Sequence, residues 1–366
     1  MPTALRRTTR FTRRTISYGF LVLLILAALL VSAANLFLPY IEKNPDKVQA
    51  WLSEQVAQPV HFDSCKATWS KRGPKIILSG LTVGKEKSLV RIGQAELLVA
   101  VYSGLLPNHP LTELKVKGLF LRLEQQQDDR WVLLGLPQQE KSDEDALDVL
   151  SGFGELQLGS SVLLVTPKNK HAIRIPRVDL RLRVQGDILS IGMQAKSVRT
   201  DTPLILVAKV DRKNFTGKIW LGGDNLHIKN WLALFPNLKT PKTTSNSELN
   251  IWADIEQRRI MRVHSRLIID ELSYDIPKKG IFDFTNHTIY KSIEAESIWQ
   301  RNDTGWDWYI PKISFVSERG EQSISNIRVQ ANQISWKAQA DSIALNPATV
   351  LMPLLKGQLP DINSWT

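Results

Sequence analysis

The sequence of 366 residues contains a single cysteine, Cys65. No disulfide can therefore form within the chain, and its fold depends on packing and hydrogen bonds alone. A long exported chain without disulfides is typical of a bacterial periplasm rather than of a secreted, disulfide-stapled scaffold. We expect Cys65 itself to be a small buried hydrophobic residue rather than a reactive thiol.

The sequence also lacks the short motifs of the common enzyme classes. Gly-x-Ser-x-Gly, P-loop and dinucleotide-binding motifs are absent. The histidines lie tens of residues apart, so they form no zinc motif. The six histidines are His61, His109, His171, His227, His264 and His287. We expect no enzyme, no cofactor and no metal site. Two alternatives stay open at this point: a carboxylate pair brought together by the fold, and sugar stacking by some of the eleven tryptophans.

An excess of one charge is present, but it is concentrated at the N-terminus. The formal net charge is +11, with 47 basic and 36 acidic residues. Five of the basic residues are the N-terminal arginines, and no dense Lys/Arg cluster interleaved with aromatics follows them. The sequence therefore predicts that nucleic acid is not a partner.

The most one-sided segment is an uncharged apolar run over residues 18–38. Its 21 residues are long enough, as a helix, to cross the roughly 30 Å hydrocarbon core of a bilayer. Basic flanks stay cytoplasmic, so the preceding arginines should fix the orientation. These topology-determining residues are Arg6, Arg7, Arg10, Arg13 and Arg14.

We therefore expect a cytoplasmic tail at 1–17, a single transmembrane helix at 18–38 and export of the remainder. The alternative is a signal peptide cleaved after Val31-Ser32-Ala33, which would export the same residues. The apolar character resumes at residues 36–38, beyond that site, and this favours a retained anchor.

The residues after the anchor change from a helical to a strand pattern. Asn44 and Pro45 predict the start of a membrane-proximal amphipathic helix at 43–57. This pattern places Val48, Trp51, Leu52 and Val56 on one helix face. From residue 60 to 366 we expect a periplasmic domain that is mainly antiparallel β, with short helices near 226–236 and 345–355 and turns at 222–224 and 302–305.

The clearest strand is "VDLRLRV", in which apolar and charged residues alternate strictly. Similar alternation recurs near residues 119–123, 204–210, 249–253, 261–269 and 313–336. A sheet with one apolar face must cover that face. A second sheet, closure into a barrel, or lipid chains lying on an open, curled sheet would each do so, and periodicity alone does not choose among them.

The order of several segments resembles the YhdP-type branch of the AsmA-like envelope proteins of Gram-negative bacteria. These segments are "LPYIEKNPDKVQAWLSEQVAQPVHFDSCKATWSKRGPKIILSGLTV", "LFLRLEQQQDDRWVLLGL", "GKIWLGGDNLHIKNWLALFP" and "ELNIWADIE". The similarity runs from about Arg13 to the C-terminus. It implies a protein anchored in the inner membrane, with an open apolar β-groove in the periplasm that conducts phospholipids towards the outer membrane.

The resemblance implies phospholipids and the inner membrane as partners, with other envelope proteins as a further class, and it carries over no catalytic residue. If the apolar parity faces the groove, the alternation supplies candidates for its lining. The candidate lining residues are Leu119, Leu121, Leu123, Val178, Leu180, Leu182 and Val184. The alternative function is an anchored envelope scaffold that fills its own core and carries no lipid. Because "INSWT" offers no capping element for a sheet edge, we also expect these residues to be the N-terminal part of a longer bridge.

Overall fold

The computed structural model describes residues 38–56, 58–84, 90–100, 112–127, 131–134, 154–168, 172–198, 202–227, 231, 246–278, 284–318, 320–332 and 335–341. This part of the chain is mainly β, as the alternation predicts. Helical residues 38–43 lead into helix α2 (Pro45–Val56), and eighteen strands follow. The strands are β1 (Val60–His61), β2 (Ser64–Ser70), β3 (Gly73–Val83), β4 (Val90–Val99), β5 (Thr112–Lys117), β6 (Phe120–Gln125), β7 (Trp131–Leu134), β8 (Glu155–Thr166), β9 (Ile173–Gln185), β10 (Ile188–Lys196), β11 (Leu204–Asp211), β12 (Thr216–His227), β13 (Asn246–Glu256), β14 (Arg259–Lys278), β15 (Phe284–Arg301), β16 (Gly305–Ser317), β17 (Gly320–Asn332) and β18 (Trp336–Gln339).

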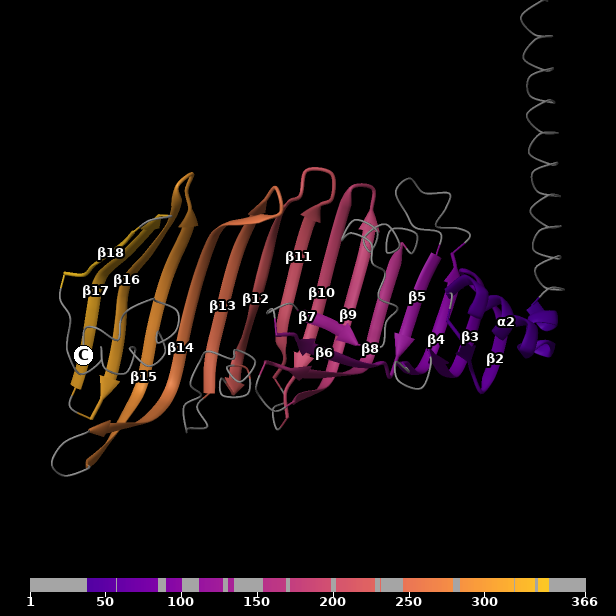
Figure 1. Ribbon diagram of the computed structural model, residues 1–366, viewed down its shortest axis with the longest axis horizontal. Coiled ribbons are helices and arrows are strands. Elements are labelled where there is room, and N and C mark those ends of the chain that lie inside the picture. Colours follow the sequence, from indigo (N-terminus) through magenta and orange to yellow (C-terminus); the bar gives the residue numbers. More distant parts are fainter. Residues whose placement is uncertain are drawn as a thin grey trace, which may run out of the picture.

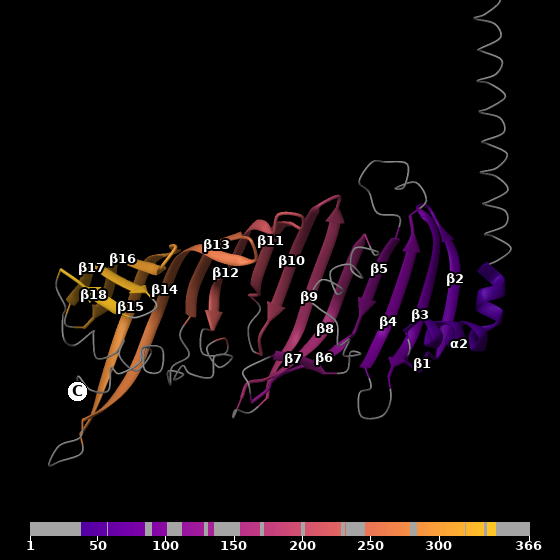
Figure 2. The ribbon, with the colours of Figure 1, turned by 45° about the horizontal axis from the view of Figure 1, so that its top comes forward.

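All of these strands belong to one long, open and curved sheet. β1 and β2 pair end to end with β3, and β4 and β5 follow. β8 then pairs with β5, β6 and β9, after which β9 to β18 pair in chain order. Figure 1 shows these strands side by side from α2 at one end to β18 at the other, and the turned view in Figure 2 shows the same row. In both views β6 and β7 run across the direction of their neighbours.

The sheet is mixed, which corrects the expectation of an antiparallel one. β8 runs parallel to both β5 and β6. The two pairings share one register, because Glu113 lies opposite Glu155 and Phe120 lies opposite Val162, each 42 positions apart in the sequence. β5 and β6 therefore act as one strand that kinks between them. Alternation reports which face a residue occupies but not the direction of the strand, so the sequence pattern could not reveal this pairing.

In a regular strand, residues two positions apart lie on the same face. At each kink this alternation is offset by one residue, so apolar side chains on both sides of the kink stay on one face. Val116 and Leu119 pack in the same cluster although they are three positions apart, with Gly118 at a φ of 67° between them. Ile324 and Ile327 share another cluster across the positive φ of Asn326. Positive φ also occurs in strand interiors at Gly80, Ser160, Asn225 and Glu271. These points bend the sheet without turning its apolar side outward.

The kink in β8 is fixed by an acidic side chain from β9. The Ser160 N–H donates to Asp179 Oδ1 at 2.7 Å, and Arg177 Nε lies 2.8 Å from the other carboxylate oxygen. Burial alone would raise the pKa of Asp179, but the Ser160 N–H and the Arg177 side chain outweigh it and lower the pKa. An ionised Asp179 thus holds the non-glycine residue Ser160 at a φ of 50°.

We expect Gly118→Ala to destabilise the protein by about 1–2 kcal/mol, because a side chain at positive φ is strained. A Cβ there would lie 3.4 Å from the backbone of Gly93, an ordinary contact distance, so the cost should come from the backbone conformation. Gly192→Ala is the matched control, since a Cβ at Gly192 meets nothing within 4 Å. Urea unfolding of the two variants measures the difference, and equal midpoints would contradict the role given to the kink.

Helix α2 packs one face against the end of the sheet. Val48 and Leu52 contact a cluster from β1 to β4, with Ile41 from the preceding turn. That cluster consists of Val60, Phe62, Cys65, Leu78, Leu81 and Ala95. The expectation for Cys65 is confirmed: it is buried, and burial, with the charge of Glu42, raises the pKa of its thiol.

Trp51, which the spacing placed on the same helix face, does not take part in this packing, and its side chain is 58% exposed. Trp51 lies about 60° from Val48 and about 100° from Leu52 around the helix, and the sheet contacts only the sector of the latter two. The amide of Asn44 donates to the Tyr40 carbonyl at 2.8 Å, so this side chain also bonds the preceding turn. The side chain of Val56 lies outside the described residues.

Two local expectations differ from the structure, and one holds. Residues 222–224 lie inside β12 rather than in a turn: Trp220 leans over Gly222, where a Cβ would come within 2.8 Å of its ring. The expected helix near 226–236 is wrong at its start, since Leu226 and His227 still pair with β13. The turn at 302–305 is confirmed by a bond from the Asn302 N–H to the Gly305 carbonyl.

The segment expected to cross the membrane lies outside the described residues, apart from Leu38, and so do the five arginines before it. The residues expected to form a helix at 345–355 also lie outside them. Within the described ranges, no helix combines the length and the apolar character that a membrane crossing requires.

Candidate functional site: the apolar face of the sheet

An unbroken row of apolar side chains crosses the sheet from β2 to β18. Each member lies directly opposite the next, so all occupy one face. This apolar ladder takes one residue from each of fifteen strands: Ala67, Ile76, Leu97, Leu114, Leu156, Leu182, Ile191, Ala208, Ile219, Ala253, Val263, Trp299, Trp308, Val329 and Ala338. At about 4.8 Å per strand, its fourteen steps span about 67 Å.

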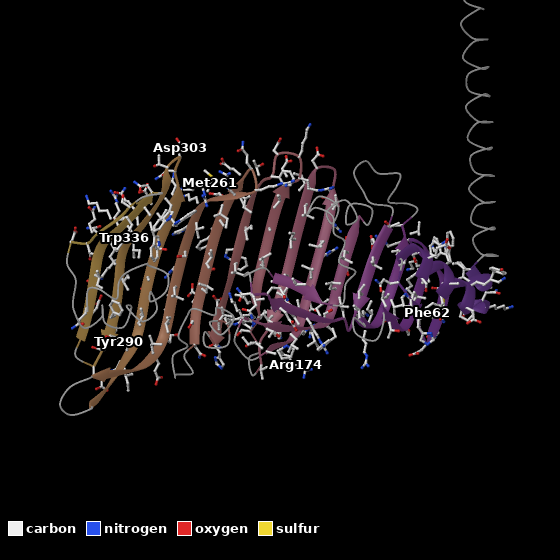
Figure 3. The ribbon with its side chains drawn as sticks, in the orientation of Figure 1. Phe62, Arg174, Met261, Tyr290, Asp303 and Trp336 are labelled. Carbon is white, nitrogen blue, oxygen red and sulfur yellow. The ribbon has the colours of Figure 1, made fainter. Side chains whose placement is uncertain are left out.

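One position along each strand, the opposite face carries an almost wholly polar row. This polar ladder consists of Thr68, Lys75, Leu98, Glu113, Glu155, Arg183, Ser190, Lys209, Lys218, Asp254, Arg262, Gln300, Asp307, Gln330 and Lys337. Leu98 is its single apolar member. Figure 3 shows side chains standing on both sides of the strands along the sheet. Along these two rows the sheet separates apolar from polar side chains. The polar face also carries an apolar and aromatic row from β11 to β15, made of Val207, Trp220, Trp252, His264 and Ile298.

The structure brings the seven candidate lining residues to the apolar face. Val178, Leu180, Leu182 and Val184 lie opposite Ala195, Met193, Ile191 and Leu189 of β10. Leu121 and Leu123 lie opposite Leu163 and Val165 of β8, which belong to a cluster with Val178. Leu119 packs with Leu121 and Leu158, and Leu158 lies opposite Leu180. Leu119 is buried, and the other six are half-buried.

Several members of this face were not among those candidates, although they extend it furthest. Ile191 and Ile219 continue the ladder through β10 and β12, and Trp299 and Trp308 carry it into β15 and β16. Alternation marked most of these strands, but the pairing register that aligns their apolar residues appears only in the folded sheet.

At the β14–β17 end, a buried cluster covers part of the apolar face. Phe315 is fully buried and lies against Tyr290, with ring centroids 5.6 Å apart. Burial raises the pKa of the Tyr290 hydroxyl. Leu272, Ile293, Ile310, Ile313 and Ile324 complete the cluster. All eighteen described strands belong to one sheet, so no second described sheet contributes to this cluster.

A few serines interrupt the aliphatic rows. Ser265 and Ser297 lie opposite each other and their hydroxyls are 2.8 Å apart, so the pair satisfies itself. Ser247 is 2% exposed, and its hydroxyl has no hydrogen-bond partner within the structure. A further buried serine, Ser161 of β8, lies opposite Val178 and is 1% exposed.

On the polar face, one carboxylate is almost fully buried. The Glu155 side chain is 2% exposed, and Arg181 and Arg183 each place a guanidinium nitrogen 2.7 Å from one of its oxygens. Burial by itself would raise the pKa of Glu155, but the Gln157 amide and the two arginines outweigh it and lower the pKa. The alternation predicted Arg181 and Arg183 on the wet face, but gave no signal for a carboxylate from another strand.

These features define a class: a mainly β protein built as one long, open, curved sheet with a continuous apolar face. Comparison with protein families agrees and is more specific. Residues 1–365 match the family model described as YhdP protein, and the chain belongs to this family. Searches of curated proteins and of solved structures found no match.

Proposed function

We propose that the apolar face is a groove along which phospholipid acyl chains move between the inner and outer bacterial membranes. The observation that supports this most is the unbroken apolar ladder. Keeping an acyl chain out of water is favourable by about 0.8 kcal/mol per methylene, so a moving lipid needs continuous apolar contact. A ladder of fifteen strands offers that contact at every step.

The same ladder favours low selectivity and no chemistry. Its members are aliphatic residues, alanines and two tryptophans, which contact acyl chains but offer no polar group that would distinguish one headgroup from another. The proposal is therefore a passive, non-enzymatic conduit without cofactor or metal. Segment 18–38 would anchor it in the inner membrane, with the five N-terminal arginines in the cytoplasm and the sheet in the periplasm. Phospholipids would be its cargo, and other envelope proteins a further class of partner.

One observation favours the alternative, a scaffold that carries no lipid. The cluster around Phe315 fills the part of the apolar face of β14 to β17 that lies beside the ladder, whereas the ladder members Val263 and Val329 are half-buried and outside the cluster. In a scaffold that carries no lipid, the protein's own side chains would cover the whole apolar face. The half-buried state of Leu180, Leu182 and Val184 in the middle of the sheet argues for the conduit instead.

A photoreactive side chain at Leu182 should capture phospholipid, whereas one at Arg181 or Arg183 should not. Because those arginines hold Glu155, β11 offers a cleaner matched pair. Leu206 belongs to the apolar face and is half-buried, whereas Lys209 on the same strand is exposed on the polar face. Mass spectrometry of the full chain irradiated in phospholipid vesicles should find lipid at Leu206 alone. Equal capture at both positions, or none at Leu206, would contradict the groove.

A further inference from the structure

Helix α2 and the helical residues just before it present an aromatic flank that faces away from the sheet and is exposed. Trp51 is 58% exposed and Tyr40 is 49% exposed. Lys47 and Trp51 lie four positions apart on α2, about 40° around the helix, and Tyr40 lies in the helical residues that precede Asn44. The Lys47 ammonium donates to the Tyr40 hydroxyl at 2.9 Å and lies 5.4 Å from its ring centroid. The flank is therefore an ordered surface of two aromatic rings around one cation.

The acidic side chains nearby lie mostly away from this flank. Asp46 lies about 100° or more from Lys47 and Trp51 around α2, and the Asp46 and Glu42 side chains are both exposed. Glu54 borders the flank only at its C-terminal end, in the turn furthest from residue 38. Val48 and Leu52 occupy the remaining sector, against the sheet. The helix thus has one side on the protein and a separate, aromatic and cationic side exposed.

The neighbouring sequence identifies what this side meets. The apolar run ends at residue 38, two positions before Tyr40. Tyrosine and tryptophan concentrate at the level of lipid headgroups, and lysine keeps its ammonium among the phosphates while its stem lies on apolar surface. We infer that α2 rests its Tyr40–Lys47–Trp51 flank on the headgroup layer of the membrane that holds segment 18–38. This inference rests on the proposed anchor.

This contact would fix the position of the first strands relative to the membrane surface. One side of α2 lies on lipid, and the other packs on Phe62, Cys65 and Leu78 at the start of the sheet. Figure 3 places Phe62 at this end, beside the helix. A helix with its side chains is about 10 Å thick, so the first strands stand about that far from the headgroups. Lipids leaving the bilayer would have one helix diameter to cross before reaching the groove.

Spin labelling of the full chain in phospholipid vesicles tests this contact. Cys65→Ala removes the native thiol, after which Trp51→Cys and Ala50→Cys each carry one nitroxide. Both positions are exposed, and they differ by about 100° around the helix. The label at 51 should collide more with oxygen and less with a water-soluble nickel chelate than the label at 50. Tyr40→Cys should behave like Trp51→Cys.

Equal nickel accessibility at 50 and 51 would overturn the inference. The groove is judged separately by lipid capture at Leu206. A water-exposed label at 51 with capture at Leu206 would overturn the membrane contact alone, whereas a lipid-exposed label without capture would overturn the groove alone.

Discussion

Ile219→Asp should stop lipids from passing the middle of the sheet. Ile219 is a half-buried member of the apolar ladder on β12, between Ala208 and Ala253. An aspartate in contact with hydrocarbon costs about 2.5–3.5 kcal/mol, and a lipid passes each strand in series. One charged position should therefore slow passage roughly a hundredfold, because each 1.4 kcal/mol is a factor of ten. When no lipid is bound, water can reach the carboxylate at this half-buried position, so the variant should still fold.

The measurement uses two photoreactive positions on the same ladder. Leu182 lies on the α2 side of β12, and Val329 lies beyond it on β17. With the chain anchored in vesicles, Ile219→Asp should leave capture at Leu182 intact and nearly abolish capture at Val329. Lys218→Asp, one residue away and exposed on the polar face, should change neither. Undiminished capture at Val329 in Ile219→Asp would show that lipid does not travel along the ladder.

Glu155→Ala should lower the free energy of unfolding by about 2 kcal/mol. Removing one partner of a buried ion pair is costly because the other charge loses its counterion, and this estimate allows for the solvent exposure of the arginines. Arg181 and Arg183 are 56% and 42% exposed, so water screens them once Glu155 is gone. Glu294→Ala is the control, because Glu294 and Arg266 are both about half exposed and the pair spans 3.3 Å. Its removal should cost at most about 1 kcal/mol.

The stabilisation from Glu155 should depend on pH in a defined direction. Its pKa is lower in the folded protein than the usual value near 4.3, so the folded state favours the ionised form. The advantage is fully present above that usual value and is lost as the pH falls through the lower, folded value. Wild type and Glu155→Gln should therefore converge in stability in acid. A constant difference from pH 7 down to pH 3 would contradict the ion pair as the cause.

Alternation identified strands and faces well, because side-chain direction is local. "VDLRLRV" placed Val178, Leu180, Leu182 and Val184 opposite the arginines, and β9 has that arrangement. It could not identify what depends on partners distant in the sequence. The parallel course of β8, the buried Glu155 and the alignment of fifteen strands each arise from such pairing.

Two local features were misread for a different reason. Gly222 suggested a turn, but it is small so that Trp220 can lie over it within a strand. Spacing placed Trp51 on one helix face with Val48 and Leu52, yet the sheet contacts only the Val48 and Leu52 sector of α2. In both cases the composition was compatible with two environments, and a tertiary contact decided between them.

Paired photocrosslinking along the sheet tests the central claim most directly. Adjacent residues on one strand form matched pairs: Ile191 with Ser190, Val263 with Arg262, and Val329 with Gln330. The account predicts phospholipid adducts at the first member of each pair and none at the second, on all three strands. Adducts at both members, or at neither, would contradict a lipid-bearing apolar face.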